Sequence, residues 1–196
     1  PVTDDLAPND VLMADYSKWL LANGCDGLAI LGTTGEANSF SLKERIRIIE
    51  NLIAGGVPAE VLMPGTGACS ITDAVELTKM AVNAGVGGVL MLPPWYYKNP
   101  SDAGLFRFFS EVIQRISDNR LQIYLYHFPQ MSATPITYNL IEMLLKAYPN
   151  VVTGMKDSSG DLENMAGAAE RFPGFEVMAG AEHCFYPLLE RGGAGC

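Results

Sequence analysis

The sequence predicts an α/β protein of the (β/α)8 TIM-barrel class, incomplete, with about six βα units visible and the first and last strands missing. Three observations predict this class. Short apolar runs alternate with amphipathic stretches. The runs end at residues 32, 65, 93, 126, 156 and 180, which is the spacing of βα units of roughly 30 residues. Polar residues follow nearly every run. Repeated βα units imply parallel strands that are joined by right-handed crossovers.

The expected strands are, in chain order, 27–32, 61–65, 88–93, 122–126, 151–156 and 176–180. Amphipathic helices are expected between them, for example at 41–54, 71–84, 103–116, 138–147 and 162–171. Ser41 and Glu44 have the spacing of a capping box at the start of the first of these helices. We expect 1–196 to be a single partial barrel domain of a longer polypeptide, because the chain opens on Pro1 and halts at 192–196, which resembles the entrance to another strand.

An open doubly wound sheet is the alternative architecture. It would be favoured by a nucleotide-binding GxGxxG after the first strand, but Gly-Thr-Thr-Gly at 32–35 lacks that spacing and no P-loop occurs. Polar residues at many strand ends favour the barrel, in which catalytic groups come from several strands at one face. Six strands cannot close an eight-stranded barrel, so the missing strands are expected in a longer chain or in another chain.

Composition and charge narrow the range of partners. The chain has 196 residues, of which 48% are hydrophobic, with a net charge of -9. The acidic balance argues against nucleic acid and acidic membrane surfaces, and no apolar run approaches the ~18 residues of a membrane span. The four cysteines (Cys25, Cys69, Cys184 and Cys196) are scattered without a CxxC, which is typical of reduced thiols in a cytoplasmic protein.

Lys156 is the first candidate for chemistry. It closes the apolar run 151–155 and precedes the polar turn 157–160. Desolvation lowers the pKa of an amine, and an unprotonated amine attacks ketones to form a Schiff base. Taken alone, a surface lysine just past a strand is the commoner interpretation. The other five lysines stand in helical or loop contexts.

A glycine-flanked threonine pair and a strand-end tyrosine are the next candidates. In the segment 32–35 the glycines allow close approach of the backbone, and the hydroxyls and N–H groups can hold a carboxylate; the alternative is a tight βα turn. Tyr124 and Tyr126 share one face of their strand, so both can point into the barrel. Tyr126 can relay protons there, or it is a core tyrosine.

Metal-dependent and glycosidase chemistry are disfavoured by the sequence. The two histidines, His127 and His183, have no ligand at helical or turn spacing, and carboxylate pairs do not stand out at strand ends. We therefore expect no metal, and covalent amine chemistry remains the best option.

Several segments in order resemble one family. They read GTTGEANSFSLKER (32–45), GTGACSITDAVELTKMAVNAG (65–85), LPPWYY (92–97), YHFP (126–129), GMKDSSGDL (154–162) and GAEHCFYPLLERGGAG (180–195). The chain resembles the pyruvate-dependent class I aldolases, the superfamily that includes dihydrodipicolinate synthase and N-acetylneuraminate lyase. Each segment alone is weak, but GTTGE followed by a strand-end lysine in this order is specific.

The resemblance implies an imine mechanism that needs no metal and no organic cofactor, and it implies roles for individual residues. Lys156 is the residue that forms an imine with pyruvate or another 2-oxo acid, and Tyr126 is the proton donor and acceptor beside it. Thr33 and Thr34 match the pair that holds the substrate carboxylate and links the tyrosines, and Gly35 completes that loop.

Further positions come from the neighbouring subunit and from the substrate's tail. The family inserts a tyrosine from the adjacent subunit into the proton relay, and counting from the threonines selects Tyr96, with Tyr97 as the alternative. Gly180, Glu182 and His183 match the loop after a strand that contacts the sugar-like tail in the lyase branch, and Ser158 follows the lysine in a similar way. The family also implies a homo-oligomer, commonly a tetramer built as a dimer of dimers.

One departure bears on the substrate. Dihydrodipicolinate synthase has an arginine five residues after the strand-end tyrosine, whereas this chain has Met131. The sequence therefore predicts an aldolase or lyase acting on a 2-oxo acid and an aldehyde, and not dihydrodipicolinate synthase proper. A sugar-acid dehydratase using the same imine, and a homologue that binds a keto acid without turnover, remain as alternatives.

Overall fold

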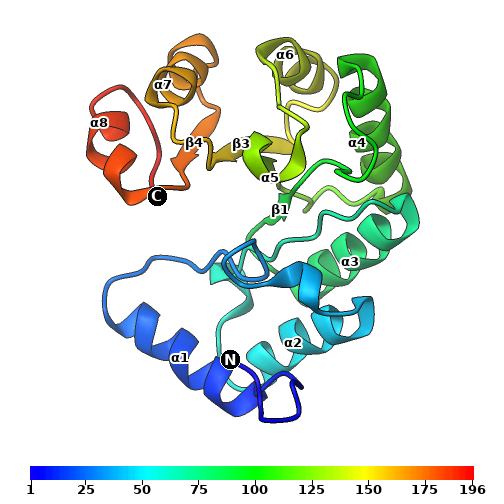
Figure 1. Cartoon of the computed structure of the whole chain (residues 1–196), viewed down its shortest axis with the longest axis vertical. Coiled ribbons are helices and arrows are strands. Elements are labelled where there is room, and N and C mark those ends of the chain that lie inside the picture. Colours follow the sequence, from blue (N-terminus) through cyan, green and yellow to red (C-terminus); the bar gives the residue numbers. More distant parts are fainter.

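The computed structural model describes residues 1–196 as an open arc, with strands along its inner side and helices along its outer side (Figure 1). The helices are α1 (Asp10–Ala22), α2 (Leu42–Ala54), α3 (Ile71–Ala84), α4 (Asp102–Ile116), α5 (Pro129–Ser132), α6 (Tyr138–Ala147), α7 (Leu162–Arg171) and α8 (Phe185–Leu189). The strands are β1 (Val89–Met91), β2 (Ile123–His127), β3 (Val152–Asp157) and β4 (Glu176–Ala179). The N-terminal and C-terminal units form the two ends of the arc.

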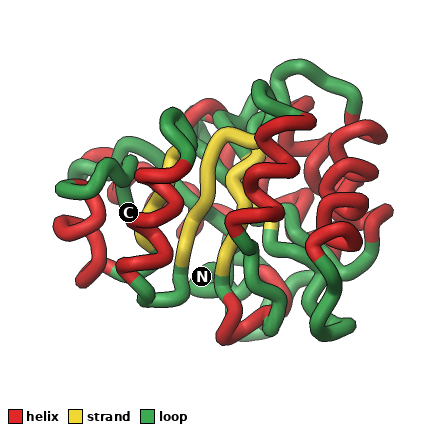
Figure 2. The backbone as a smooth tube through the Cα atoms, turned by 90° about the horizontal axis from the view of Figure 1, so that it is seen from above, coloured by secondary structure: helices red, strands yellow, loops and turns green.

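The four strands form a parallel sheet in the order β1-β2-β3-β4 (Figure 2). Tyr126 on β2 stands opposite Lys156 on β3, and His127 stands opposite Asp157. This sequential order has no reversal, and the major helices lie on the outer side alone, unlike a doubly wound sheet. The four strands expected from residue 88 onward are confirmed, with ends shifted by one or a few residues.

The strands expected at 27–32 and 61–65 are corrected by the structure. These segments lie in the expected place, but they pair only through isolated parallel bridges, Leu28 with Leu62 and Gly65 with Leu90. Two features shorten them. Leu31 has φ +54°, which takes the backbone out of the extended region, and Pro64 has no N–H to donate to a ladder.

The five expected helices are confirmed within one residue at each end. Their starts are fixed by local caps, and the Ser41–Glu44 capping box is present, with the Ser41 N–H donating to Glu44 Oε2 at 2.8 Å. Helices α1, α5 and α8 were not expected. In α1 the apolar side chains do not keep to one face, because Leu12 and Trp19 are exposed while Ala14 is buried, and that weakens the helical pattern.

The core is divided between two clusters of buried apolar side chains. The larger contains 29 residues and lies between the outer face of the sheet and α3, α4, α6 and α7, with Leu125 and Met155 fully buried. The smaller contains nine residues and lies under α1 and α2. After β4, the segment expected to begin another strand pairs in parallel through Met178 and Gly195. A helix with the length and apolarity required to span a membrane is absent.

Candidate active site

The carboxyl ends of β2 and β3 bring Lys156 and Tyr126 together. The Lys156 Nζ lies 5.0 Å from the centroid of the Tyr126 ring. Alternation along each strand accounts for this meeting, because Leu125 and Met155 turn outward into the core while Tyr126 and Lys156 turn inward. Tyr126 is 4% exposed and Lys156 is half-buried. An amine and a phenol therefore lie side by side in a partly desolvated position at the carboxyl ends of β2 and β3.

The threonine loop joins this pair from a distant part of the chain. The Tyr126 hydroxyl donates a hydrogen bond to Thr33 Oγ1 at 3.2 Å. Thr34 and Gly35 are exposed beside it. A Cβ on Gly35 would lie 3.1 Å from the backbone nitrogen of Leu31, so the tight loop favours glycine at this position. Thr33, Thr34 and Gly35 thus present a hydroxyl-rich loop next to the tyrosine.

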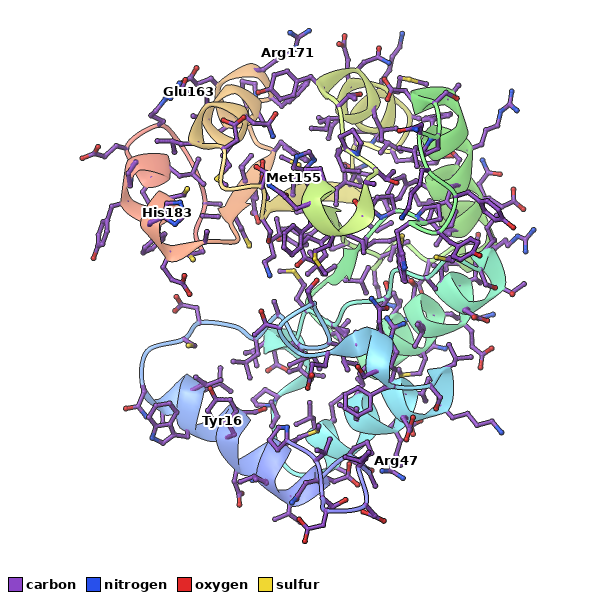
Figure 3. All side chains as sticks on the ribbon, in the orientation of Figure 1. Tyr16, Arg47, Met155, Glu163, Arg171 and His183 are labelled. Carbon is purple, nitrogen blue, oxygen red and sulfur yellow. The ribbon has the colours of Figure 1, made fainter.

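Ser158 and Gly180 are also brought together. The Gly180 N–H donates to the Asp157 carbonyl at 2.7 Å, and a Cβ on Gly180 would lie 2.0 Å from Ser158 Oγ. Only glycine allows the serine hydroxyl to lie against this backbone. Glu182 is exposed at the start of the short 3-10 turn Glu182–Cys184, in the segment between β4 and α8 that His183 marks in Figure 3.

Tyr96 and Tyr97 stand apart from this group. They are 71% and 83% exposed, and their rings pack edge to face with centroids 5.1 Å apart. No hydrogen bond joins either tyrosine to Tyr126 or Thr33 within the chain. The geometry of one chain therefore does not choose between them.

Tyr124 lies lower on the same inner face as Tyr126, as expected from alternation. Its hydroxyl donates to Glu176 Oε2 at 2.6 Å. A Cβ on Gly154 would lie 2.9 Å from the Tyr124 ring, so the missing side chain leaves room for the ring. Burial, then the hydrogen bond to Glu176, raises the pKa of the Tyr124 phenol. The Tyr124 ring therefore fills space on the inner face of the sheet, and its phenol stays protonated.

Three polar residues are buried in ways that the sequence reasoning did not predict: Arg45 and Asp157 were not considered, and His127 was considered only as a metal ligand. Arg45 on α2 donates from Nη2 to the Gly65 carbonyl at 2.7 Å and to the Gly67 carbonyl at 3.3 Å, and burial lowers the pKa of its guanidinium. His127 and Asp157 are buried behind the sheet. An arginine in an amphipathic helix is ordinarily a surface residue, so no local signal identifies it. A polar residue at an outward strand position is a signal for the other two.

The donors available to a metal are sparse. No group of three or more His, Cys, Asp or Glu side chains is close enough together to hold an ion. His127 accepts the Ile136 N–H at Nδ1 over 3.0 Å, and burial lowers the pKa of its imidazole, against an opposing effect of Asp157. The imidazole is therefore engaged in holding the backbone after β2.

Comparison with known proteins places this chain in a family. The model of the dihydrodipicolinate synthetase family matches residues 9–196. The chain belongs to that family. A DapA-like lyase of uncharacterised function from Chloroflexus aurantiacus is 34% identical over 100% of this chain and 65% of its own length. A 4-hydroxy-tetrahydrodipicolinate synthase of Thermus thermophilus is 36% identical over 90% of this chain and 58% of its own length.

Solved structures of family members share the fold. The crystal structure of dihydrodipicolinate synthase from Agrobacterium tumefaciens superposes with a TM-score of 0.94 at 32% identity, over 98% of this chain and 67% of its own. The family protein YagE from E. coli K12, in complex with pyruvate, has a TM-score of 0.86 at 27% identity, over 99% of this chain and 65% of its own. The expected family and the partial-barrel fold are confirmed. The chain spans 65% of the length of the Chloroflexus relative.

Proposed function

We propose that the protein is a class I aldolase or lyase that forms a Schiff base and makes or breaks a C–C bond of a 2-oxo acid, with pyruvate as product or donor. The observation that carries this proposal is the Lys156 Nζ 5.0 Å from the ring centroid of Tyr126, whose hydroxyl is bonded to Thr33. Pyruvate bound to the family protein YagE supports the choice of keto acid.

The chemistry begins with the amine. The Lys156 Nζ attacks the C2 carbonyl of the 2-oxo acid, and the resulting carbinolamine loses its hydroxyl as water to give an iminium. Tyr126 supplies the proton for this departure. When the C3–C4 bond of the bound acid breaks, its electron pair moves into the iminium to form an enamine, and Tyr126 takes the proton from the C4 hydroxyl as the aldehyde leaves. Protonation of the enamine at C3 and hydrolysis return pyruvate and the free amine, so no organic cofactor is required.

The carboxylate of the 2-oxo acid is assigned to the threonine loop. Thr33 is already a hydrogen-bond partner of Tyr126, and the exposed Thr34 and Gly35 offer a hydroxyl and a backbone N–H beside it. Holding the carboxylate there orients C2 toward the Lys156 amine before any bond forms. Ser158, Gly180 and Glu182 are assigned to the remainder of the substrate, because they follow β3 and β4 at the same edge of the sheet.

The aldehyde is proposed to lack a carboxylate that must be gripped. Met131 on α5 is 58% exposed and offers no cationic fork where the sequence of dihydrodipicolinate synthase has an arginine. A hydroxylated aldehyde derived from a sugar acid suits the neighbouring Ser158 and Glu182. The reaction proposed is therefore not that of dihydrodipicolinate synthase proper.

A second subunit is proposed to complete the proton path. Tyr96 and Tyr97 are exposed aromatic side chains on one loop, and burial against another copy would remove large apolar surface from water. We assign Tyr96 to the neighbouring subunit's relay in a dimer of dimers.

Product analysis with matched lysine variants tests the function. The protein at its natural length is incubated with 2-keto-3-deoxy sugar acids, and pyruvate release is measured for wild type, Lys156→Ala and Lys79→Ala. Lys79 is an exposed lysine on α3 and serves as the control. Pyruvate release is expected in wild type and in the Lys79 variant, and none in the Lys156 variant. Turnover retained by Lys156→Ala would contradict the proposal, whereas water loss without pyruvate would identify a dehydratase.

A further inference from the structure

The residue after the proposed nucleophile carries a completely buried carboxylate. Asp157 has an exposure of 0%, although its strand neighbour Lys156 reaches the mouth of the arc. Burying a carboxylate is costly unless its oxygens are hydrogen-bonded. Each oxygen of Asp157 has one donor: the Ser159 N–H bonds Oδ1 at 2.8 Å, and the Asn164 side-chain amide bonds Oδ2 at 2.7 Å. No salt bridge includes Asp157, so neutral donors hold its charge.

These two bonds tie the end of β3 to the turn that follows and to the first turn of α7. Asn164 is itself fixed, because its backbone N–H donates to Asp161 Oδ1 at 3.1 Å and its carbonyl accepts from the Tyr138 hydroxyl at 2.8 Å. The carboxylate of Asp157 therefore bonds the end of β3 to a residue of α7 that is itself held by two other hydrogen bonds.

The backbone around Asp157 joins three neighbouring strands at the level of the site. The Ser158 N–H donates to the His127 carbonyl at 2.8 Å, which links β3 to β2. The Gly180 N–H donates to the Asp157 carbonyl at 2.7 Å, which links β4 to β3. These contacts set where Lys156 and Ser158 lie relative to Tyr126 and Gly180. The side chain of Asp157 fixes the turn on which they depend.

We propose that Asp157 is a positioning residue for imine formation, which rests on the proposed function of Lys156. Its buried carboxylate locks the turn 157–160 against α7, and so holds the Lys156 amine beside the Tyr126 ring. Misplacing a reacting group by about 1 Å can lower a rate on the order of 100-fold, so a fixed strand end matters for an amine that must reach a ketone carbon.

The polarity of the Asp157–Asn164 contact provides the test. In Asp157→Asn an amide replaces a group that accepts two hydrogen bonds, so one amide nitrogen faces a donor, either Asn164 or the Ser159 N–H. The double variant Asp157→Asn/Asn164→Asp restores the pair with donor and acceptor exchanged. Asn164→Ala removes one donor and leaves the Ser159 bond. Leu144→Ala, at a fully buried position of α6, serves as a control for general destabilisation.

The readout is the rate of covalent trapping by pyruvate and borohydride in the protein at its natural length, measured against pyruvate concentration. For Asp157→Asn we expect the rate at saturating pyruvate to fall roughly 10- to 100-fold. The half-saturating concentration should change by less than about 3-fold, because the loop 32–35 that holds the carboxylate is untouched. The double variant should recover to within about 5-fold of wild type, and Asn164→Ala should lose less than Asp157→Asn. If Asp157→Asn does not fold, the other two variants decide.

Three outcomes would overturn the proposal. One is a trapping rate in Asp157→Asn no lower than that of Leu144→Ala at equal stability. Another is a double variant that regains stability but not rate. The third is a loss confined to the half-saturating concentration. In each of these cases wild type still forms the adduct and the proposed function stands. Absence of any adduct in wild type removes both the function and the positioning role.

Discussion

The N-terminal 65 residues and the sheet region that follows differ in strand pairing and in the size of their apolar clusters. In the sheet region four strands pair continuously and cover a cluster of 29 buried residues, whereas the N-terminal segments pair through isolated bridges and share a cluster of nine. Lys156 and Tyr126 belong to the first region, and Thr33 and Thr34 to the second. The hydrogen bond from Tyr126 to Thr33 is where the two regions meet in the site.

This difference suggests a division of labour within the proposed site. The groups that form the imine and move its protons need the tighter positional control, and they stand on paired strands. The loop that receives the substrate carboxylate can adjust to its ligand, because few ladder hydrogen bonds hold it. Substitutions in the two regions should therefore differ both in size and in the kinetic constant that they change.

The largest effect is expected from removing the proton carrier on the sheet. Tyr126→Phe deletes a hydroxyl and keeps the ring beside Lys156, so turnover should fall about 10²- to 10⁴-fold while the fold persists. Its stability should change by only about 1 kcal/mol, because one partly buried hydrogen bond is lost. Pyruvate release at saturating substrate and a urea transition measure the two quantities. A variant with near wild-type turnover would remove Tyr126 from the chemistry.

A matched pair of core truncations compares the two regions in stability. Leu125 in the sheet region and Leu62 in the N-terminal region are both 0% exposed. Leu125→Ala should cost about 3–5 kcal/mol and Leu62→Ala about 2–3 kcal/mol, within the range for such truncations. Leu62 belongs to the smaller cluster, whose members Leu28 and Leu31 border a cavity of about 470 Å³, so its surroundings can collapse more readily. Urea unfolding midpoints, compared at a constant m-value, give the loss of unfolding free energy for each variant. A larger loss of stability in Leu62→Ala than in Leu125→Ala would contradict this difference between the two regions.

A smaller effect is expected in the threonine loop. Thr33→Val keeps the shape of the side chain and removes the acceptor of the Tyr126 hydroxyl and a proposed carboxylate donor. Turnover should fall roughly 10-fold, in keeping with one hydrogen bond of about 1–1.5 kcal/mol, and the half-saturating pyruvate concentration should rise. Steady-state kinetics over a range of pyruvate concentrations separate these terms. If only turnover at saturation changes, Thr33 acts through Tyr126 and not on the carboxylate.

The smallest effect is expected at the start of α2. Ser41→Ala removes the hydroxyl that accepts the Glu44 N–H at 3.3 Å, and such caps contribute about 1 kcal/mol. The loss lies in the N-terminal region and touches no proposed substrate contact, so kinetic constants should stay within about 2-fold of wild type at 25 °C. Thermal unfolding measures the change. A loss of activity larger than the loss of stability would show that α2 positions the threonine loop.

Local signals explain what the sequence could predict. Ser41, Ser70 and Asp161 each begin a helix, and the side chain of each accepts a backbone N–H from the first turn of that helix. Lys156 and Tyr126 could be proposed because each stands at the end of an apolar run, and the family resemblance gave each a role. The apolar residues at 27–32 and 61–65 predict full strands, but Leu31 has a positive φ, which the pattern of apolar residues does not indicate.

Other features depend on contacts that no local pattern contains. The burial of Asp157 requires an amide from α7, seven residues later, and the burial of Arg45 requires two carbonyls from the next unit. Whether Tyr96 or Tyr97 reaches a site depends on how two chains meet. Residues of this kind become visible only when the distances between distant segments are known.

The most direct test of the amine chemistry is trapping at Lys156. The protein at its natural length is incubated with pyruvate and sodium borohydride, its intact mass is measured, and the modified peptide is mapped. A single reduced pyruvate adduct on the peptide that contains Lys156 is the predicted result. An adduct on another lysine, such as the exposed Lys98, or no adduct on folded protein, would contradict the assignment of Lys156 as the Schiff-base residue.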